Sequence, residues 1–343
     1  MLAAVLYGKE ELRVEPVAVP RVGPSDVLVK VHVALTCGTD LKVFRRGYHA
    51  RMIVPPAVLG HELAGDVVEV GPEVEEFRVG QRVVAANSAP CGNCYFCARN
   101  QENLCEDLLF NNGAYAEYIR IPGLIVRKNM YEIPRHISYQ DAALIEPLAC
   151  VLRGLDETQL RPGDTVAVIG LGPIGLMFVR LAKAMDARVI AVGRRKTQLE
   201  KAEKMGADEL ISIDTVTDAV EAVRRLTYRG RGADVAIEAV GQPETWNWAI
   251  RMARSGGVVN LFGGCPTGSE ISLDTALLHY SEITLKSSFH HTPSSVRRAL
   301  EIIGRGEIKA ADFVTGEAPL SEILGVLRHM MNRNGHLKTA ILP

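Results

Sequence analysis

The spacing of apolar residues changes about halfway along the chain, from short runs broken by turns to longer continuous ones. The first part, up to about residue 110, contains short β-like runs separated by turn signals such as Gly23-Pro24 and Gly71-Pro72. The runs span residues 12–19, 26–35, 64–70 and 82–86. Short apolar segments bounded by Gly and Pro predict a compact, mostly-β domain.

The pattern becomes one of alternating strands and helices after the Arg161–Asp164 turn. The expected strands are 165–169, 188–192, 210–213 and 233–238, and the expected helices are 176–185, 198–205 and 216–226. Continuous apolar strands that alternate with helices are typical of a parallel sheet covered on both faces. The sequence therefore predicts an α/β protein with a doubly wound domain over residues 152–283, between a first domain at 1–151 and a last segment at 284–343.

Three further helices are expected, wholly or partly outside this doubly wound domain. A short one spans residues 38–46, and another, capped by Ser138, runs to about Thr158 with Pro147 kinking or interrupting it just after Glu146. The last segment is expected to hold a helix at 293–304 and a final strand at 338–342.

Composition narrows the possible classes of protein. A chain of 343 residues is long for one hydrophobic core, which favours two domains. The formal net charge is −1 and basic residues are dispersed, so nucleic acid is not an expected partner. The apolar, uncharged stretch at 165–179 is short for a membrane span and is broken by glycines, and we expect no secretory signal. Seven cysteines, four of them clustered, favour a reducing compartment and a cytoplasmic protein.

The clustered cysteines form a lobe at about residues 87–112. They follow a C-x2-C-x2-C-x7-C spacing at Cys91, Cys94, Cys97 and Cys105. Four thiolates can occupy all four positions of a tetrahedral zinc, which leaves no position for a substrate. We therefore expect a structural zinc in this lobe.

A second set of metal-binding side chains is scattered along the first domain. It comprises Cys37, His61, Glu62 and Glu146, which offer one sulfur, one nitrogen and carboxylate oxygens. A mixed set that leaves one position open is what a catalytic zinc requires.

A glycine-rich turn follows the first strand of the doubly wound domain. Gly170, Gly172 and Gly175 give the spacing G-x-G-x-x-G, with Pro173 and Ile174 between the last two. A strand before it and a helix after it make this a dinucleotide-binding fingerprint, whose pyrophosphate lies at the helix N-terminus.

The end of the following strand indicates which dinucleotide is bound. NAD sites usually place Asp or Glu there, whereas this sequence has Gly193, Arg194 and Arg195. Glycine leaves room for a 2′-phosphate, and guanidinium groups suit its charge and geometry. We therefore expect NADP to be preferred over NAD.

These motifs together resemble those of the zinc-dependent medium-chain alcohol dehydrogenase family, over essentially the whole chain. The polyol (sorbitol) and threonine dehydrogenase branches are the most similar. The matching residues are Cys37 to Asp40, Gly60 to Glu62, the four clustered cysteines, Glu146-Pro147 and Gly170 to Gly175. The resemblance implies a GroES-like first domain that takes back the C-terminal segment, an inserted Rossmann domain, and an active site in the cleft between them.

The resemblance also implies roles for individual residues. Cys37 and His61 would hold the catalytic zinc together with Glu62 or Glu146. Thr39 would form a hydrogen bond with the alcohol oxygen and would be the first group of the proton relay to solvent. Asp40 would either anchor the zinc-binding histidine or pair with a basic residue such as Lys338.

One position departs from the family pattern, because Lys42 stands where many members have a relay histidine. A lysine is normally protonated at neutral pH and is a poor base. The proton route could then run through the nicotinamide ribose, Glu62 or His49. His290 and His291 are candidates either for binding substrate hydroxyls or for the edge of the Rossmann domain.

The function expected is therefore zinc-dependent hydride transfer between a secondary alcohol or polyol and NADP, in a homodimer or homotetramer. An NAD-dependent threonine-type enzyme is the alternative of the same class. A non-catalytic zinc module for binding other macromolecules is the alternative of another class, although it would leave the dinucleotide domain without a role.

Overall fold

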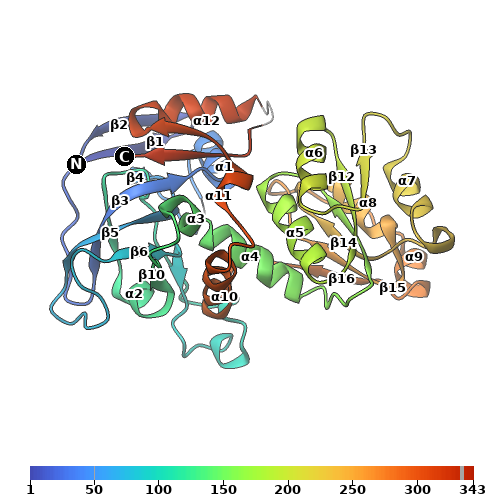
Figure 1. The fold of residues 1–343 in the computed structure, drawn as a ribbon, viewed down its shortest axis with the longest axis horizontal. Coiled ribbons are helices and arrows are strands. Elements are labelled where there is room, and N and C mark those ends of the chain that lie inside the picture. The colour runs from blue at the N-terminus through green and yellow to red at the C-terminus, as the bar shows by residue number, and fades with distance from the viewer. Residues whose placement is uncertain (50, 333–335) are drawn as a thin grey trace. The chain divides into compact units, whose positions relative to one another are not determined.

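The computed structural model describes residues 1–49, 51–332 and 336–343, and it divides into two compact units. The first unit contains residues 1–149 and 291–343, and the second contains residues 150–290. The sequence placed these boundaries after residues 151 and 283. The colours in Figure 1 show the C-terminal segment, in red, among the blue and cyan strands of the first unit.

The first unit is built around a mixed sheet whose central strand is β3 (Val27–Leu35). β3 pairs antiparallel with β5 (Glu62–Val70), β9 (Tyr118–Ile121) and β18 (Lys338–Leu342). Pairing between β18 and β3 is what joins the chain's last residues to its first domain. The remaining strands of this sheet are β6 (Arg82–Ala85), β10 (Met130–Glu132) and β17 (Val314–Pro319).

Smaller elements complete the first unit. A three-stranded sheet contains β1 (Leu2–Gly8), β2 (Glu11–Pro16) and β4 (Ala57–Val58), and β7 (Ser88–Ala89) pairs with β8 (Leu109–Phe110). The helices are α1 (Gly38–Arg46), α2 (Gly123–Asn129), α3 (Tyr139–Ala143), α10 (Pro293–Gly304), α11 (Ala310–Phe313) and α12 (Ile323–Met331). The helices predicted at 38–46 and 293–304 and the final strand are confirmed.

The helix predicted from Ser138 to Thr158 is two helices, and the predicted position of its interruption is wrong. α3 ends at Ala143, and α4 (Ile145–Asp156) begins two residues later. Pro147 therefore lies in the first turn of α4, where its missing N–H has no helical acceptor to lose. The break precedes Glu146 instead of following it.

The second unit is a parallel sheet with the strand order β13-β12-β11-β14-β15-β16. The strands are β11 (Thr165–Ile169), β12 (Arg188–Gly193), β13 (Glu209–Ser212), β14 (Ala233–Glu238), β15 (Ala253–Leu261) and β16 (Thr284–Ser287). The helices are α5 (Pro173–Ala184), α6 (Lys196–Lys204), α7 (Ala219–Arg225), α8 (Pro243–Met252) and α9 (Thr275–Tyr280). Figure 1 shows α5 and α6 on one side of the sheet and α7 and α8 on the other.

This topology confirms the predicted doubly wound α/β domain. The chain proceeds outward from β11 to β13, then returns to β14 on the other side of β11. The order of the strands therefore reverses between β11 and β14. In such sheets ligands bind at the carboxyl ends of the strands at this switch point. Among the residues described, no helix is long and apolar enough to cross a membrane.

Candidate active site and metal centres

The four clustered cysteines converge in the lobe where the sequence placed them. Their sulfur atoms all lie within 4.8 Å of one another. Cys91 Sγ lies 4.0 Å from Cys97 Sγ, and Cys94 Sγ lies 3.8 Å from Cys105 Sγ. A tetrahedral zinc with ordinary Zn–S bonds requires sulfurs about 3.8 Å apart. The spacing of the four thiols fits that ion.

Backbone hydrogen bonds and burial shift the pKa values of two of these thiols in opposite directions. Backbone N–H groups of Cys97 and Glu106 lower the pKa of Cys94 to about 6, whereas burial raises the pKa of Cys105 to about 12. Since zinc binds thiolates, metal binding at this site would release protons.

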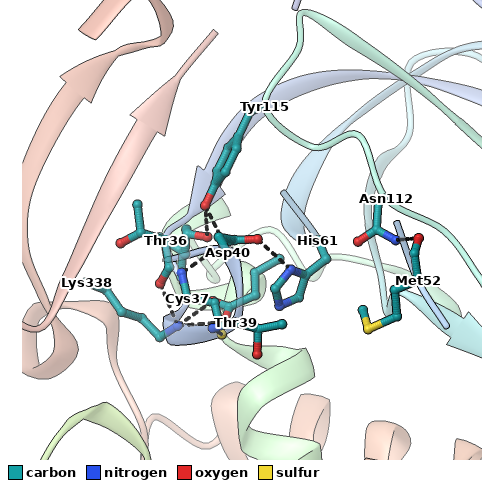
Figure 2. Close-up of polar contacts among 11 residues, drawn as sticks. Thr36, Cys37, Thr39, Asp40, Met52, His61, Asn112, Tyr115 and Lys338 are labelled. Carbon is teal, nitrogen blue, oxygen red and sulfur yellow. Dashed lines mark hydrogen bonds and ion pairs between the residues drawn. The ribbon is translucent and has the colours of Figure 1, made fainter. Parts of the chain in front are cut away.

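Cys37 is placed by the start of helix α1. It is the N-cap residue, and its Sγ accepts the Thr39 N–H at 3.4 Å. In return, the Asp40 carboxylate accepts the Cys37 backbone N–H at 3.0 Å, which completes a capping box. The capping box therefore fixes the position of the Cys37 sulfur at the start of α1. Thr39 lies beside Cys37 in Figure 2.

His61 reaches the same place from the residue before β5. Its Nδ1 lies 3.0 Å from Asp40 Oδ1, and both side chains are buried, with exposed fractions of 4% and 1%. When Nδ1–H donates its hydrogen bond to Asp40, the ring's other nitrogen, Nε2, carries the lone pair that can bind a metal. Of the two roles expected for Asp40, the contacts show the anchoring of His61.

The charges of this pair shift both pKa values. Burial alone would raise the pKa of Asp40. The His61 charge and the hydrogen bonds that Asp40 accepts outweigh this effect, so the pKa lies below its ordinary value. Burial lowers the pKa of His61, but Asp40 beside it raises it well above its ordinary value.

Lys338 pairs with Glu62, the residue after His61. Lys338 Nζ lies 2.6 Å from both Glu62 carboxylate oxygens and 3.1 Å from the Thr36 carbonyl oxygen, and both side chains are almost fully buried. Burial raises the pKa of Glu62 to about 7, and the Lys338 charge opposes that rise. The lysine comes from β18, so the C-terminal strand supplies part of this site.

The structure brings Cys37, His61 and Glu62 together, with their ligand atoms within 4.8 Å of one another. A sulfur, an imidazole nitrogen and a carboxylate in that space fit a zinc that keeps an open position. Glu146 is not in this group among the described residues. It is buried (7% exposed) in the first turn of α4, and its charge acts on Glu62 and Lys338.

The remaining polar candidates occupy different settings. His291 is buried, its Nε2 lies 3.1 Å from Asn87 Oδ1, and burial lowers its pKa to about 4. His290 belongs to the other unit and stacks on Phe289. His49 Nδ1 accepts the N–H groups of Arg51 and Met52. Lys42 is exposed on α1.

The glycine turn of the second unit lies between β11 and α5. Gly170 has φ +91°, in the left-handed region, and a Cβ on Gly175 would lie 1.7 Å from the Gly170 carbonyl oxygen. Gly172 is the N-cap of α5, with Pro173 at the helix start and Ile174 following. A Cβ on Gly172 would meet nothing within 4 Å, so the backbone there is open to a ligand. This arrangement fits a pyrophosphate at the helix N-terminus.

The residues expected to select the cofactor follow the neighbouring strand. Gly193 ends β12, and Arg195 is the N-cap of α6. Arg194 is 70% exposed, and its Nε lies 3.3 Å from Asp214 Oδ1. Both guanidinium groups thus come from the carboxyl edge of the sheet, next to the glycine turn.

Sequence reasoning missed two buried polar residues, Tyr115 and Glu238, and named Lys338 only as a possible partner of Asp40. Tyr115 contacts Asp40, Lys338 contacts Glu62 instead of Asp40, and Glu238 is completely buried at the end of β14. Glu238 Oε1 accepts hydrogen bonds from the N–H groups of Val240 and Gly241. The signal available for Glu238 was a carboxylate directly after the apolar run Val235 to Ile237 in β14 (Ala233–Glu238).

Comparisons with known proteins agree with this geometry. Two family profiles match: "Alcohol dehydrogenase GroES-like domain" over residues 23–134 and "Zinc-binding dehydrogenase" over residues 173–305. Sorbitol dehydrogenase of Bacillus subtilis (strain 168) is 34% identical over 351 residues, covering 100% of this chain and 97% of its own.

Solved structures show the same fold over the whole chain. A protein of Sinorhizobium meliloti 1021, described as a zinc-binding dehydrogenase and bound to NADP, has a TM-score of 0.90 at 32% identity, covering 100% of this chain and 99% of its own. A protein of Escherichia coli CFT073, described as a short chain alcohol dehydrogenase and complexed with NADH, has a TM-score of 0.90 at 26% identity, with coverage of 100% and 99%.

Proposed function

The chain belongs to the zinc-binding alcohol dehydrogenase family, and we propose that it transfers hydride between a secondary alcohol or polyol and NADP. One observation carries the proposal most directly. The ligand atoms of Cys37, His61 and Glu62 lie together, separately from the four-thiol lobe. A closed site and an open site in one chain are what a structural and a catalytic zinc require.

The zinc at the open site would supply a Lewis acid that lowers the pKa of the substrate alcohol. The chain's own residues bind and orient around it. Cys37 and His61 are the first two ligands. Glu62 is the third ligand that the geometry favours, and Glu146 is the carboxylate whose charge lies nearby. Thr39 would bond the alcohol oxygen, and its position in the first turn of α1, two residues after Cys37, supports this role.

The second unit would hold the dinucleotide by backbone groups and arginines. The open N-cap at Gly172 receives the pyrophosphate, and Arg194 and Arg195 receive the 2′-phosphate of NADP. Solved relatives contain NADP in one case and NADH in the other, so the arginines are the argument for NADP in this chain.

The proposed substrate class follows from polar residues and from the relatives. Carboxylates beside the metal site, with Thr39 and His49, suit a substrate with several hydroxyl groups. Sorbitol dehydrogenase of Bacillus subtilis is named for such a substrate. We further propose a homodimer or homotetramer, which light scattering of the purified protein would test.

A substrate panel tests the proposed function. The purified protein is assayed with sorbitol-like polyols, threonine and primary aliphatic alcohols of increasing length, each with NADP and NAD. We expect polyols with NADP to give the highest kcat/KM. Preference for threonine with NAD would establish the alternative enzyme, and preference for long primary alcohols would refute the proposed substrate class.

Metal removal tests the mechanism separately. Mild chelation should remove the zinc of the open site first, with loss of activity before loss of fold. Full activity in protein shown to contain no metal would refute zinc-dependent hydride transfer. Absence of dehydrogenase activity in the protein loaded with two zincs would favour the non-catalytic module.

A further inference from the structure

Tyr115 is a completely buried tyrosine whose hydroxyl lies against the candidate metal centre. Its exposed fraction is 0%, and its hydroxyl donates to Asp40 Oδ2 at 2.6 Å. Figure 2 shows Asp40 between the Tyr115 hydroxyl and the His61 ring. The same carboxylate therefore connects a tyrosine from one segment with a metal-binding histidine from another.

The hydrogen bonds around Asp40 divide between its two oxygens. Oδ2 accepts from the Tyr115 hydroxyl and from the Cys37 backbone N–H, and Oδ1 faces His61 Nδ1. With Oδ2 held from two directions, the carboxylate plane cannot rotate without losing hydrogen bonds. Oδ1 is consequently fixed toward His61, which fixes the ring and its proton on Nδ1.

Tyr115 is itself held on rigid backbone. Its N–H donates to the Leu59 carbonyl at 2.9 Å, and the Ala114 N–H donates to the Gly60 carbonyl at 3.1 Å. Gly60 has φ +91°, and a Cβ on it would lie 2.8 Å from Tyr115 Cγ. The tyrosine ring therefore packs directly on the backbone of the residue that precedes His61, which only glycine permits.

The phenol remains a donor at all ordinary pH values. Burial, and then the negative charge of Asp40, raise the pKa of Tyr115 well above its ordinary value. Its hydroxyl hydrogen has one strong acceptor at 2.6 Å, and the Leu35 carbonyl lies farther away at 3.3 Å. A phenylalanine at this position would keep the ring and remove the hydroxyl together with its contacts to Asp40 and the Leu35 carbonyl.

We propose that Tyr115 is a positioning residue for the catalytic metal: its hydroxyl fixes Asp40, and Asp40 holds the His61 ring with Nε2 directed to the metal. This inference rests on one part of the proposed function, namely that the open site binds zinc. It gives Tyr115 no contact with substrate. Outer partners of metal ligands are commonly worth about tenfold to a hundredfold in metal affinity, and we expect a loss of about tenfold for this indirect contact.

The test compares Tyr115→Phe with a matched variant, Tyr139→Phe. Tyr139 also donates its hydroxyl to an aspartate, Asp66 Oδ1 at 2.5 Å, in the same unit, but neither residue is in the metal centre. Zinc affinity is measured by competition with a chromophoric chelator, and the four-thiolate zinc serves as an internal reference in each protein. Unfolding of each metal-free protein is measured in parallel.

We expect Tyr115→Phe to weaken zinc at the open site about tenfold, to leave the four-thiolate zinc unchanged, and to raise the rate of zinc release. Tyr139→Phe should change neither affinity. Unchanged open-site affinity in Tyr115→Phe would overturn the proposal, and so would an equal loss in Tyr139→Phe, which would indicate a general effect on stability. If the wild-type protein binds no zinc at the open site, the proposed function fails instead.

A double-mutant cycle shows whether Tyr115 acts through Asp40. Asp40→Asn removes the buried negative charge. Adding Tyr115→Phe to Asp40→Asn therefore leaves no buried carboxylate that has lost a hydrogen-bond donor. The double variant can for this reason be studied even if Tyr115→Phe alone does not fold. The proposal predicts little further loss of zinc affinity in the double variant relative to Asp40→Asn. A further tenfold loss in that background would show that Tyr115 does not act through Asp40.

Discussion

Removing the Arg195 side chain should reduce the use of NADP much more than the use of NAD. Arg195 is the half-buried N-cap of α6, directly after the end of β12. A phosphate bound there would meet both its guanidinium group and the positive end of a nine-residue helix. NAD has no phosphate at this position, so it would lose little when the guanidinium is removed.

The expected magnitude follows from the charges at this edge of the sheet. A hydrogen bond between charged groups contributes about 1.5–3 kcal/mol, which corresponds to about ten- to a hundredfold in affinity. The Arg194–Asp214 pair does not compete strongly for Arg194, because both side chains are more than half exposed and such pairs contribute about 0–1 kcal/mol. We therefore expect kcat/KM for NADP to fall ten- to a hundredfold in Arg195→Ala.

The assay measures kcat/KM for both cofactors at saturating alcohol in wild type and variants. Lys196→Ala is the matched control, because Lys196 is the next basic residue and its side chain is 91% exposed. It should leave the ratio of the two kcat/KM values nearly unchanged. Gly193→Asp should turn preference toward NAD, since a carboxylate repels the 2′-phosphate.

Gly193→Ala separates the charge of that aspartate from its bulk. A Cβ at Gly193 would lie 2.8 Å from Leu171 Cδ1, the end of a flexible side chain, so both variants require the same small shift. The reasoning would be refuted by a wild-type ratio that favours NAD, or by equal losses for the two cofactors in Arg195→Ala. Either result would mean that the arginines do not reach the phosphate.

Four further variants test other parts of the structure. Cys37→Ser should abolish turnover with the fold retained, whereas Cys94→Ser should impair folding or assembly. Circular dichroism and metal content distinguish the two outcomes. Equal behaviour of the two variants would contradict the assignment of two kinds of metal site. Gly60→Ala should lower the free energy of unfolding by at least about 1–2 kcal/mol, because Gly60 has φ +91° and the added methyl group would meet the Tyr115 ring. An unchanged unfolding midpoint would contradict that packing. Burial raises the pKa of Glu238 in the folded protein. The wild-type protein should therefore lose stability, relative to Glu238→Gln, as pH rises from 4.5 through the raised pKa. If the difference in unfolding midpoint between the two proteins does not depend on pH, Glu238 is not a buried titrating carboxyl group.

Elements whose signals are local were predicted well from the sequence. The helix at 38–46 and the strands at 165–169 and 233–238 have the predicted bounds, because turn residues and apolar runs mark both ends. The interruption near Pro147 was placed wrongly for a related reason. Proline signals a helix boundary, but the sequence does not say whether it ends one helix or stands in the first turn of the next.

The contacts around Asp40 could not be predicted in this way. Sequence left its partner open between His61 and Lys338, and the answer depends on how β18 pairs with β3. In the observed register Ala340 lies opposite Leu35, and the Lys338 side chain reaches Thr36 and Glu62, the latter 276 residues away in sequence. Tyr115 is 75 residues from Asp40 and belongs to no motif that spacing could reveal.

The two candidate metal sites differ in predictability for the same reason that their ligand sets differ in chemistry. A closed site needs only four thiolates from one lobe, and a single segment with short spacings supplies them. The candidate open site instead draws on different ligand types around a free position, and these come from separate segments. Cys37 comes from a helix start, His61 and Glu62 from the beginning of β5, and Lys338 from the last strand. Sequence can therefore offer candidate ligands for such a site, but the residues that orient those candidates emerge only when the strands are paired.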